Sequence, residues 1–112
     1  MDLVLENRTI GEWTVVRVAG ELDLHTSPQL RDHVVSMIGE RSGARLALDL
    51  TEVGFLDSSS LGMLVTLLKR IKERGGDLRL VGVSGSPMKV FALTGLDRVF
   101  ELVDSANELP AD

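Results

Sequence analysis

The sequence predicts an α/β protein with a small mixed β-sheet, an N-terminal antiparallel hairpin and helices packed against the sheet. Two segments of alternating polar and apolar residues come first, and a short turn joins them. Helix-like and strand-like segments then alternate to give the order β-β-α-β-α-β-α. The two strand-helix-strand units require parallel neighbours and right-handed crossovers. A chain of 112 residues fits one domain, with a core expected at about residues 3–107 and a flexible tail at 108–112.

The hairpin and the first helix are indicated by local signals. Strands are expected at residues 3–8 and 13–18, on either side of the turn signal Gly11-Glu12. The pair Thr26-Ser27 then offers an N-cap, and Pro28 suits a first helical turn. Apolar residues continue at helical spacing until a glycine ends the helix, at Gly39 or Gly43.

The second half of the chain repeats the strand-helix alternation. Its central feature is the serine turn, defined here as Asp57-Ser58-Ser59-Ser60, which joins an apolar strand to an apolar-periodic helix. Gly75-Gly76 is a typical signal for the end of that helix, and Gly95 for the end of the next. The expected elements are strands at 45–50, 78–83 and 99–103, helices at 59–74 and from 86 or 87 to 95, and a helical tail at 104–109.

Composition excludes several classes of function. The formal net charge of -5 disfavours nucleic acid, and we expect no nucleic-acid partner. The chain has no cysteine, and His25 and His33 lack a metal-ligand spacing, so no metal site is expected. No glycine-rich phosphate loop occurs, and no cofactor is predicted. No signal peptide or membrane span is visible, so a cytoplasmic protein without a membrane partner is expected, as a monomer or weak dimer.

The serine turn permits three interpretations. If Ser58 or Ser59 caps the helix, unpaired N–H groups beyond it face solvent, and a phosphate there meets the positive end of the helix dipole. The residues could instead serve only as caps. A serine hydrolase is the enzymatic alternative, yet the Gly-x-Ser-x-Gly frame is missing. The absence of a base beside the serines favours a switch that another protein modifies over an enzyme.

Four motifs resemble those of the bacterial anti-anti-sigma factors, which are single STAS domains. The likeness covers about residues 3–107. In that family the unphosphorylated protein captures an anti-sigma factor that is also a serine kinase, and so releases a sigma factor for transcription. Phosphorylation of a serine ends the capture, and the resemblance therefore also implies a serine phosphatase. The motifs are Gly20-Glu21-Leu22-Asp23, Phe55-Leu56-Asp57-Ser58-Ser59-Ser60-Leu61-Gly62, Gly75-Gly76-Asp77-Leu78 and Val90-Phe91-Ala92-Leu93-Thr94-Gly95-Leu96.

The resemblance implies that Ser58 accepts the phosphate, with Ser59 as second choice. It also implies a partner-binding surface near the serine turn. One departure stands out: the family usually has glycine where this chain has Ser60, so a side chain is expected where a partner backbone would otherwise approach. The partner-binding candidates are Glu21, Asp23, Asp57, Ser59, Ser60, Gly62, Met63 and Leu67.

Helix geometry bears on Met63 and Leu67, which lie one turn apart. Five apolar residues of the same helix should bury against the sheet, and these two fall near the opposite side. They are either covered by the third helix or exposed to dock the anti-sigma factor. The expected buried face consists of Leu61, Leu64, Val65, Leu68 and Ile71.

The alternative to an anti-anti-sigma factor is a STAS module used as a scaffold of a signalling assembly or as an accessory part of a transporter.

Overall fold

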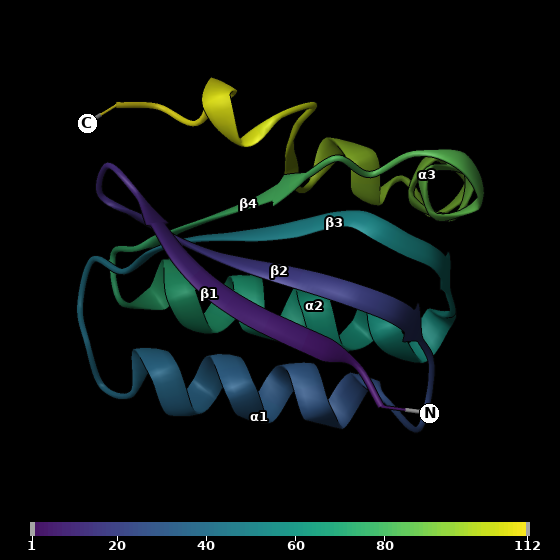
Figure 1. The fold of residues 1–112 in the computed structure, drawn as a ribbon, viewed down its shortest axis with the longest axis horizontal. Helices are drawn as coiled ribbons and strands as arrows, with labels where there is room; N and C mark the ends of the chain where they lie inside the picture. The colour runs from purple at the N-terminus through teal and green to yellow at the C-terminus, as the bar shows by residue number, and fades with distance from the viewer. Residues whose placement is uncertain (1, 112) are drawn as a thin grey trace.

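The computed structural model describes residues 2–111 and confirms the predicted α/β fold (Figure 1). Its sheet has five strands in the order β1-β2-β3-β4-β5; β1 and β2 are antiparallel, and the remaining neighbours are parallel. The strands are β1 (Val4–Ile10), β2 (Trp13–Leu22), β3 (Arg45–Leu56), β4 (Asp77–Val81) and β5 (Glu101–Val103). The helices are α1 (Ser27–Ile38), α2 (Ser58–Glu73) and α3 (Gly85–Thr94), with short 3-10 turns at η1 (Leu96–Arg98) and η2 (Ala106–Glu108).

Both faces of the sheet are covered, by different segments. Figure 1 shows α1 and α2 on one face, and α3 with the C-terminal segment on the other. Most of the core lies between the sheet and the helices, where Leu30, Leu48 and Leu64 are fully buried. Near α3, the rings of Phe91 and Phe100 meet edge to face, with 5.7 Å between the ring centroids. Burial of aliphatic side chains thus supplies most of the stabilisation, as the scarcity of aromatic residues requires.

The C-terminal segment is part of the fold. It packs on a second apolar cluster, in which Ala106 and Leu109 lie with Trp13 on the face of the sheet opposite α1 and α2. The Trp13 indole N–H donates to the Pro110 carbonyl at 2.8 Å. The expectation of a flexible tail is therefore wrong for residues 108–110, because Leu109 is buried and the backbone beyond it accepts a hydrogen bond. Asp112 lies outside the described residues.

Strands β2 and β3 run further than the sequence predicts, to Leu22 and Leu56 instead of Val18 and Leu50. The two strands pair with each other over this extra length, across two shifts of register. Gly20 lies in the second irregular stretch with a φ of +128°, where a Cβ would meet the Leu3 side chain at 3.2 Å. The extended pairing carries both strands to the serine turn, so their carboxyl ends position it.

The buried face of α2 differs from the predicted one. Leu67 is 1% exposed and belongs to the core, whereas Val65 and Leu68 are only partly buried. Of the two alternatives for Leu67, exposure for docking is wrong; the side chain is buried, but α1 and the sheet cover it, since α3 lies on the other face. The buried residues of α2 are Ser60, Leu61, Leu64, Leu67 and Ile71.

Candidate functional site

Asp57 is the N-cap of α2, and neither Ser58 nor Ser59 takes that place. Its backbone is extended, with φ -103° and ψ 178°, and its carboxylate turns back over the first turn of the helix. Oδ1 accepts from the Ser60 N–H at 3.0 Å, from the Ser59 hydroxyl at 2.7 Å, and lies 3.0 Å from the Ser60 hydroxyl. The carboxylate outcompetes the hydroxyls as a cap because it is charged and lies nearest the positive end of the helix dipole.

These contacts keep Asp57 ionised. Partial burial acts to raise the pKa of Asp57, but the hydrogen bonds from Ser59 and Ser60 act in the other direction and together lower the pKa below its ordinary value of 3.8. The backbone of Leu24, in the neighbouring loop, adds to the lowering. A carboxylate that receives several donors is stabilised in its charged form. The serine turn therefore carries a negative charge that hydrogen bonds from Ser59 and Ser60 stabilise.

The three serines occupy three different environments. Ser58 is exposed at the first position of α2, and within residues 2–111 its hydroxyl makes no hydrogen bond. Ser59 is exposed too, but its hydroxyl donates to Asp57. Ser60 is 0% exposed. The expectation that Ser60 presents a side chain to a partner is therefore wrong, because α2 begins with Ser60 facing the interior. Of the three hydroxyls, that of Ser58 alone is both exposed and without a hydrogen bond in the described residues.

Ser60 is joined to α1 through a buried pair of hydroxyls. Its Oγ lies 2.6 Å from Oγ of Ser27, and Ser27 Oγ lies 2.6 Å from the Asp23 carbonyl oxygen. The Ser60 hydroxyl also lies 3.0 Å from Asp57 Oδ1. The two serines thus make three oxygen–oxygen contacts, but they have only two hydroxyl hydrogens between them. The hydrogen bonds therefore run either from Ser27 through Ser60 to Asp57, or from Ser60 through Ser27 to Asp23. In both arrangements the start of α1 is linked to the start of α2.

The loop before α1 is held by Asp23. Its Oδ1 accepts from the backbone N–H groups of His25 and Thr26, both at 2.9 Å. The Thr26 N–H is the main cause of a lowered pKa at Asp23, with partial burial opposing it. The carboxylate of Asp23 thus holds its own loop, whereas Glu21 is exposed with its side chain turned to solvent. Of the two acids, Glu21 is the one left free for a partner.

The loops before α1 and α2 lie side by side, since the Asp57 N–H donates to the Leu22 carbonyl at 3.2 Å. Two apolar side chains are exposed near them: Leu24, in the loop before α1, is 68% exposed, and Phe55, near the end of β3, is 44% exposed. Neither residue was singled out from the sequence. Leu24 lies between the polar residues Asp23 and His25, but this position alone does not show whether its side chain is exposed. Apolar groups exposed beside a reactive hydroxyl favour contact with a protein.

One turn after Ser58, helix α2 has a glycine at its surface. Gly62 is exposed, and a Cβ added there would meet nothing within 4 Å. Met63 is half-buried against the core, so it offers only part of its side chain to solvent. Leu67 offers none. The partner-binding candidates thus differ in exposure: Glu21, Ser59 and Gly62 are exposed, Asp23, Asp57 and Met63 are half-buried, and Ser60 and Leu67 are buried.

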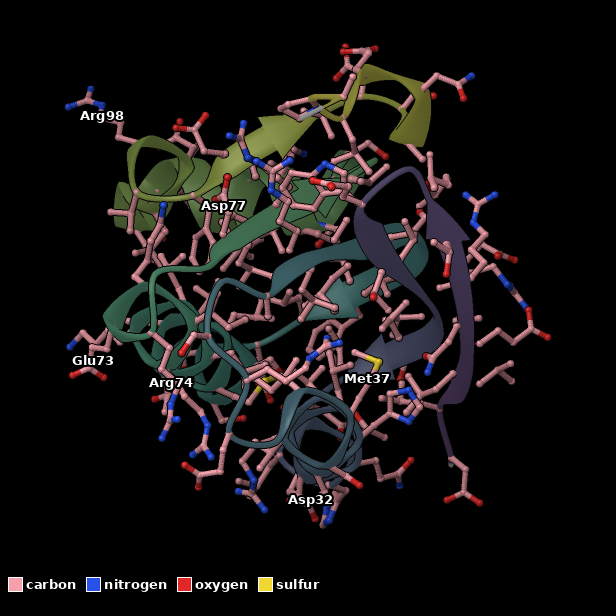
Figure 2. The ribbon with its side chains drawn as sticks, turned by 90° about the vertical axis from the view of Figure 1, so that its left-hand side faces the viewer. Asp32, Met37, Glu73, Arg74, Asp77 and Arg98 are labelled. Carbon is pink, nitrogen blue, oxygen red and sulfur yellow. The ribbon has the colours of Figure 1, made fainter. Side chains whose placement is uncertain are left out.

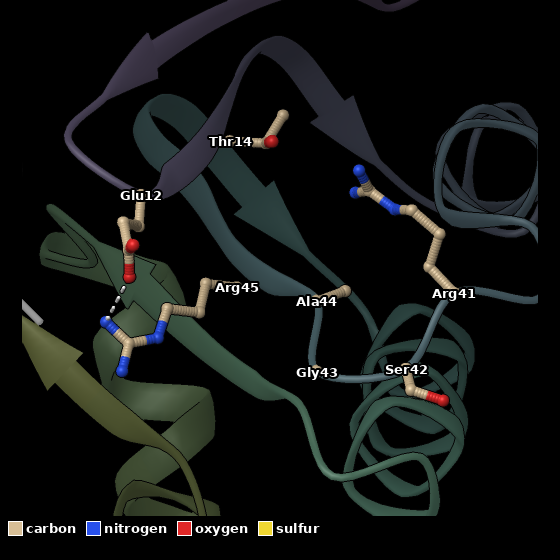
Figure 3. Close-up of a pocket in the computed structure, with 7 residues that line it drawn as sticks. All are labelled: Glu12, Thr14, Arg41, Ser42, Gly43, Ala44 and Arg45. Atoms are coloured by element: carbon tan, nitrogen blue, oxygen red, sulfur yellow. Dashed lines mark ion pairs between the residues drawn. The ribbon is translucent and has the colours of Figure 1, made fainter.

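A pocket of about 160 Å³ lies elsewhere (Figure 3). Its lining includes the hairpin turn and the loop before β3, at the opposite end of β3 from the serine turn, and a Glu12–Arg45 ion pair of 3.6 Å borders it. The histidines are also apart from the serines: His33 Nε2 lies 2.7 Å from Asn7 Oδ1, and no hydrogen bond within residues 2–111 joins a histidine ring to a serine. No helix within residues 2–111 has the length and apolar character to cross a membrane.

The family model described as STAS domain matches residues 4–109, and the chain therefore belongs to the STAS domain family. Among curated proteins, it is 34% identical over 92 residues to the anti-sigma-B factor antagonist of Listeria monocytogenes, covering 82% of this chain and 80% of the relative. The protein of the same name from Bacillus subtilis is 34% identical over 87 residues, covering 78% of each chain. These relatives are named for regulation and not for a reaction.

Solved structures agree with this. An anti-sigma factor antagonist of Mycobacterium paratuberculosis superposes with a TM-score of 0.82 at 26% identity, covering 95% of this chain and 89% of the other. The Bacillus anti-sigma factor antagonist SpoIIAA has been solved in unphosphorylated and phosphorylated forms, with TM-scores of 0.75 and 0.69 at 27% identity. Each covers 95% of this chain, which covers 90% and 94% of them. SpoIIAA is thus a relative that exists in the two states a phosphorylation switch needs.

Proposed function

We propose that this chain is an anti-anti-sigma factor that works by binding and has no catalysis of its own. In its unphosphorylated form it captures an anti-sigma factor that is also a serine kinase, and a sigma factor is released. The kinase phosphorylates Ser58, and a serine phosphatase restores the binding form. The relatives named anti-sigma-B factor antagonist support this assignment, as does the existence of SpoIIAA in both phosphorylation states. We expect this exchange to take place in the cytoplasm.

The observation that carries the assignment to Ser58 is the difference between the three serines. The Ser58 hydroxyl is exposed and unengaged in the described structure, the Ser59 hydroxyl is held by Asp57, and Ser60 is buried. In the transfer, the Ser58 oxygen bonds to the γ-phosphorus of ATP on the kinase, the bond to the leaving ADP breaks, and the hydroxyl proton goes to a base of the kinase. Ser59 would first have to leave Asp57.

The partner surface that we propose surrounds Ser58. Leu24 and Phe55 supply exposed apolar contact, Glu21 a free carboxylate, and Gly62 a place where a partner backbone can approach. A phosphate adds about 1.5–2 negative charges, which a partner docked over the turn would have to desolvate. On the domain itself the phosphate has little effect, since the helix dipole favours it by only about 0.3–1 kcal/mol. Phosphorylation therefore acts on the complex and not on the fold.

The test is to incubate the protein with the anti-sigma kinase of its own organism and ATP, and to locate the phosphate by mass spectrometry. We expect one phosphate on Ser58, no labelling of Ser58→Ala, and normal labelling of the matched control Ser59→Ala. Labelling of Ser58→Ala at the wild-type rate would remove Ser58 as the acceptor. If the kinase binds the protein and labels no serine, the switch is absent.

A further inference from the structure

Strand β1 has one free edge. It comes first in the sheet order and pairs with β2 alone, and Figures 1 and 2 show it at the border of the sheet. The hairpin closes with Ile10 opposite Trp13 around a two-residue turn, so these two share backbone hydrogen bonds. The pattern then alternates along β1, and the backbone N–H and C=O groups of Leu5, Asn7 and Thr9 point away from β2. Such an edge is a template for another strand.

The charges on β1 are arranged so that the strand complements itself. In an antiparallel pair of two copies centred on Asn7, the whole strand from Val4 to Ile10 overlaps and Glu6 faces Arg8 of the other copy, twice by symmetry. Registers centred on Glu6 or on Arg8 oppose like charges, and registers centred on Leu5 or Thr9 pair only a few residues. Unlike charges directly opposite each other stabilise a strand pair, and like charges destabilise it.

The charged side chains have exposed surface left for a second contact. The side chains of Glu6 and Arg8 are 62% and 55% exposed, and they project from the face of the sheet away from α1. Within the chain Glu6 pairs with Arg17 at 2.8 Å and Arg8 with Asp49 at 3.9 Å, so each gains a second partner in the dimer. Asn7 projects to the other face, where its side chain meets His33 Nε2 at 2.7 Å and donates to Met37 Sδ at 3.3 Å. Figure 2 shows Met37 on α1 beside this strand. The centre of β1 is thus held in place while its outer backbone groups stay free.

We propose that β1 pairs with β1 of a second copy of this chain, antiparallel and centred on Asn7, to form a homodimer with one continuous sheet. The two Asn7 residues exchange two backbone hydrogen bonds at the centre, and Leu5 and Thr9 of opposite copies do the same on either side. Glu6 of each copy lies between these pairs, opposite Arg8 of the other copy. The contact is one strand wide, which makes the dimer a weak one whose population rises with protein concentration.

Two charge reversals test the register. E6R and R8E each place like charges opposite each other in their own homodimer, so each should self-associate about tenfold more weakly than wild type by sedimentation velocity. Mixed together, the two variants are complementary at every charged pair and should associate again. The control Glu73→Arg, at an exposed position at the end of α2, changes the net charge as E6R does and should associate like wild type. Failure of the mixture to associate, or equal weakening by Glu73→Arg, overturns the proposal.

Amide hydrogen exchange of the wild-type protein supplies a second readout that needs no variant. At high protein concentration the Leu5, Asn7 and Thr9 amides should exchange at least several-fold more slowly than in dilute solution. A wild-type protein that stays monomeric at millimolar concentration contradicts the proposal. So does an association that leaves these three amides unprotected, because the contact would then lie on another surface.

Discussion

The buried hydroxyl pair Ser27–Ser60 should couple the two helices that begin beside Ser58. Ser27→Ala leaves the Ser60 hydroxyl free to donate to Asp57, and the Asp23 carbonyl keeps the Ser27 N–H at 2.9 Å. Ser60→Ala leaves the Ser27 hydroxyl donating to Asp23, and Asp57 keeps the Ser59 hydroxyl and the N–H of residue 60. No buried donor is orphaned, so each change should cost only about 0.5–1.5 kcal/mol of unfolding free energy.

The double variant distinguishes a coupled pair from two independent hydroxyls. Each single change removes the 2.6 Å contact between the two Oγ atoms, so the sum of the two single costs includes this contact twice. The double variant loses the same contact only once. We therefore expect S27A/S60A to cost less than the sum of the single changes, by about 0.5–1.5 kcal/mol in urea unfolding with unchanged slopes. In the control S27A/S59A, whose hydroxyls do not touch, the costs should add within about 0.3–0.5 kcal/mol. Additivity of S27A with S60A within the same limits would refute the coupling.

Three further predictions concern single residues. The lowered pKa of Asp57 means that its charge stabilises the fold above its ordinary pKa of 3.8, and that this stability is lost as the pH falls through the lower folded value. The difference in unfolding free energy between wild type and Asp57→Asn should therefore shrink as the pH falls from neutral to below 3.8, and a constant difference would contradict this account. Gly62→Ala should raise stability by about 0.5–1 kcal/mol, because the site is open and helical, yet weaken binding of the anti-sigma factor; unchanged binding would take Gly62 out of the proposed surface. Leu67→Ala should cost about 2–5 kcal/mol in urea unfolding, whereas the 88% exposed Leu93→Ala should cost much less, and similar values for both would contradict the burial of Leu67.

The sequence predicted the fold because the fold depends on local signals. The Gly11-Glu12 turn, the N-cap residues before α1 and the Gly75-Gly76 signal after α2 all lie where the structure has its boundaries, within a few residues. Element lengths were less accurate, since β2 and β3 stabilise each other beyond their own apolar runs. Periodicity alone could not show that α2 is covered by α1 as well as by the sheet, and so it misplaced Leu67.

The serine turn was recognised from the sequence, but the roles within it were not. The burial of Ser60 depends on Ser27, which lies 33 positions away and belongs to another helix. The capping role of Asp57 depends on where α2 begins, and four consecutive residues that can all serve as caps leave this start open. Leu24 and Phe55 were missed because the exposure of a single apolar residue depends on the packing of the whole fold. What the sequence did indicate is a set of hydroxyls at a helix start with no base beside them.

The central claim is that phosphate on Ser58 blocks binding of the anti-sigma factor while the domain stays folded. It is tested most directly by titrating the anti-sigma factor with the protein before and after stoichiometric phosphorylation, and by melting both forms. We predict tight binding by the unphosphorylated form, binding at least 100-fold weaker by the form phosphorylated on Ser58, which corresponds to about 2.7 kcal/mol, and closely similar Tm values for both. Equal affinities, or a phosphorylated form that unfolds, would contradict the account.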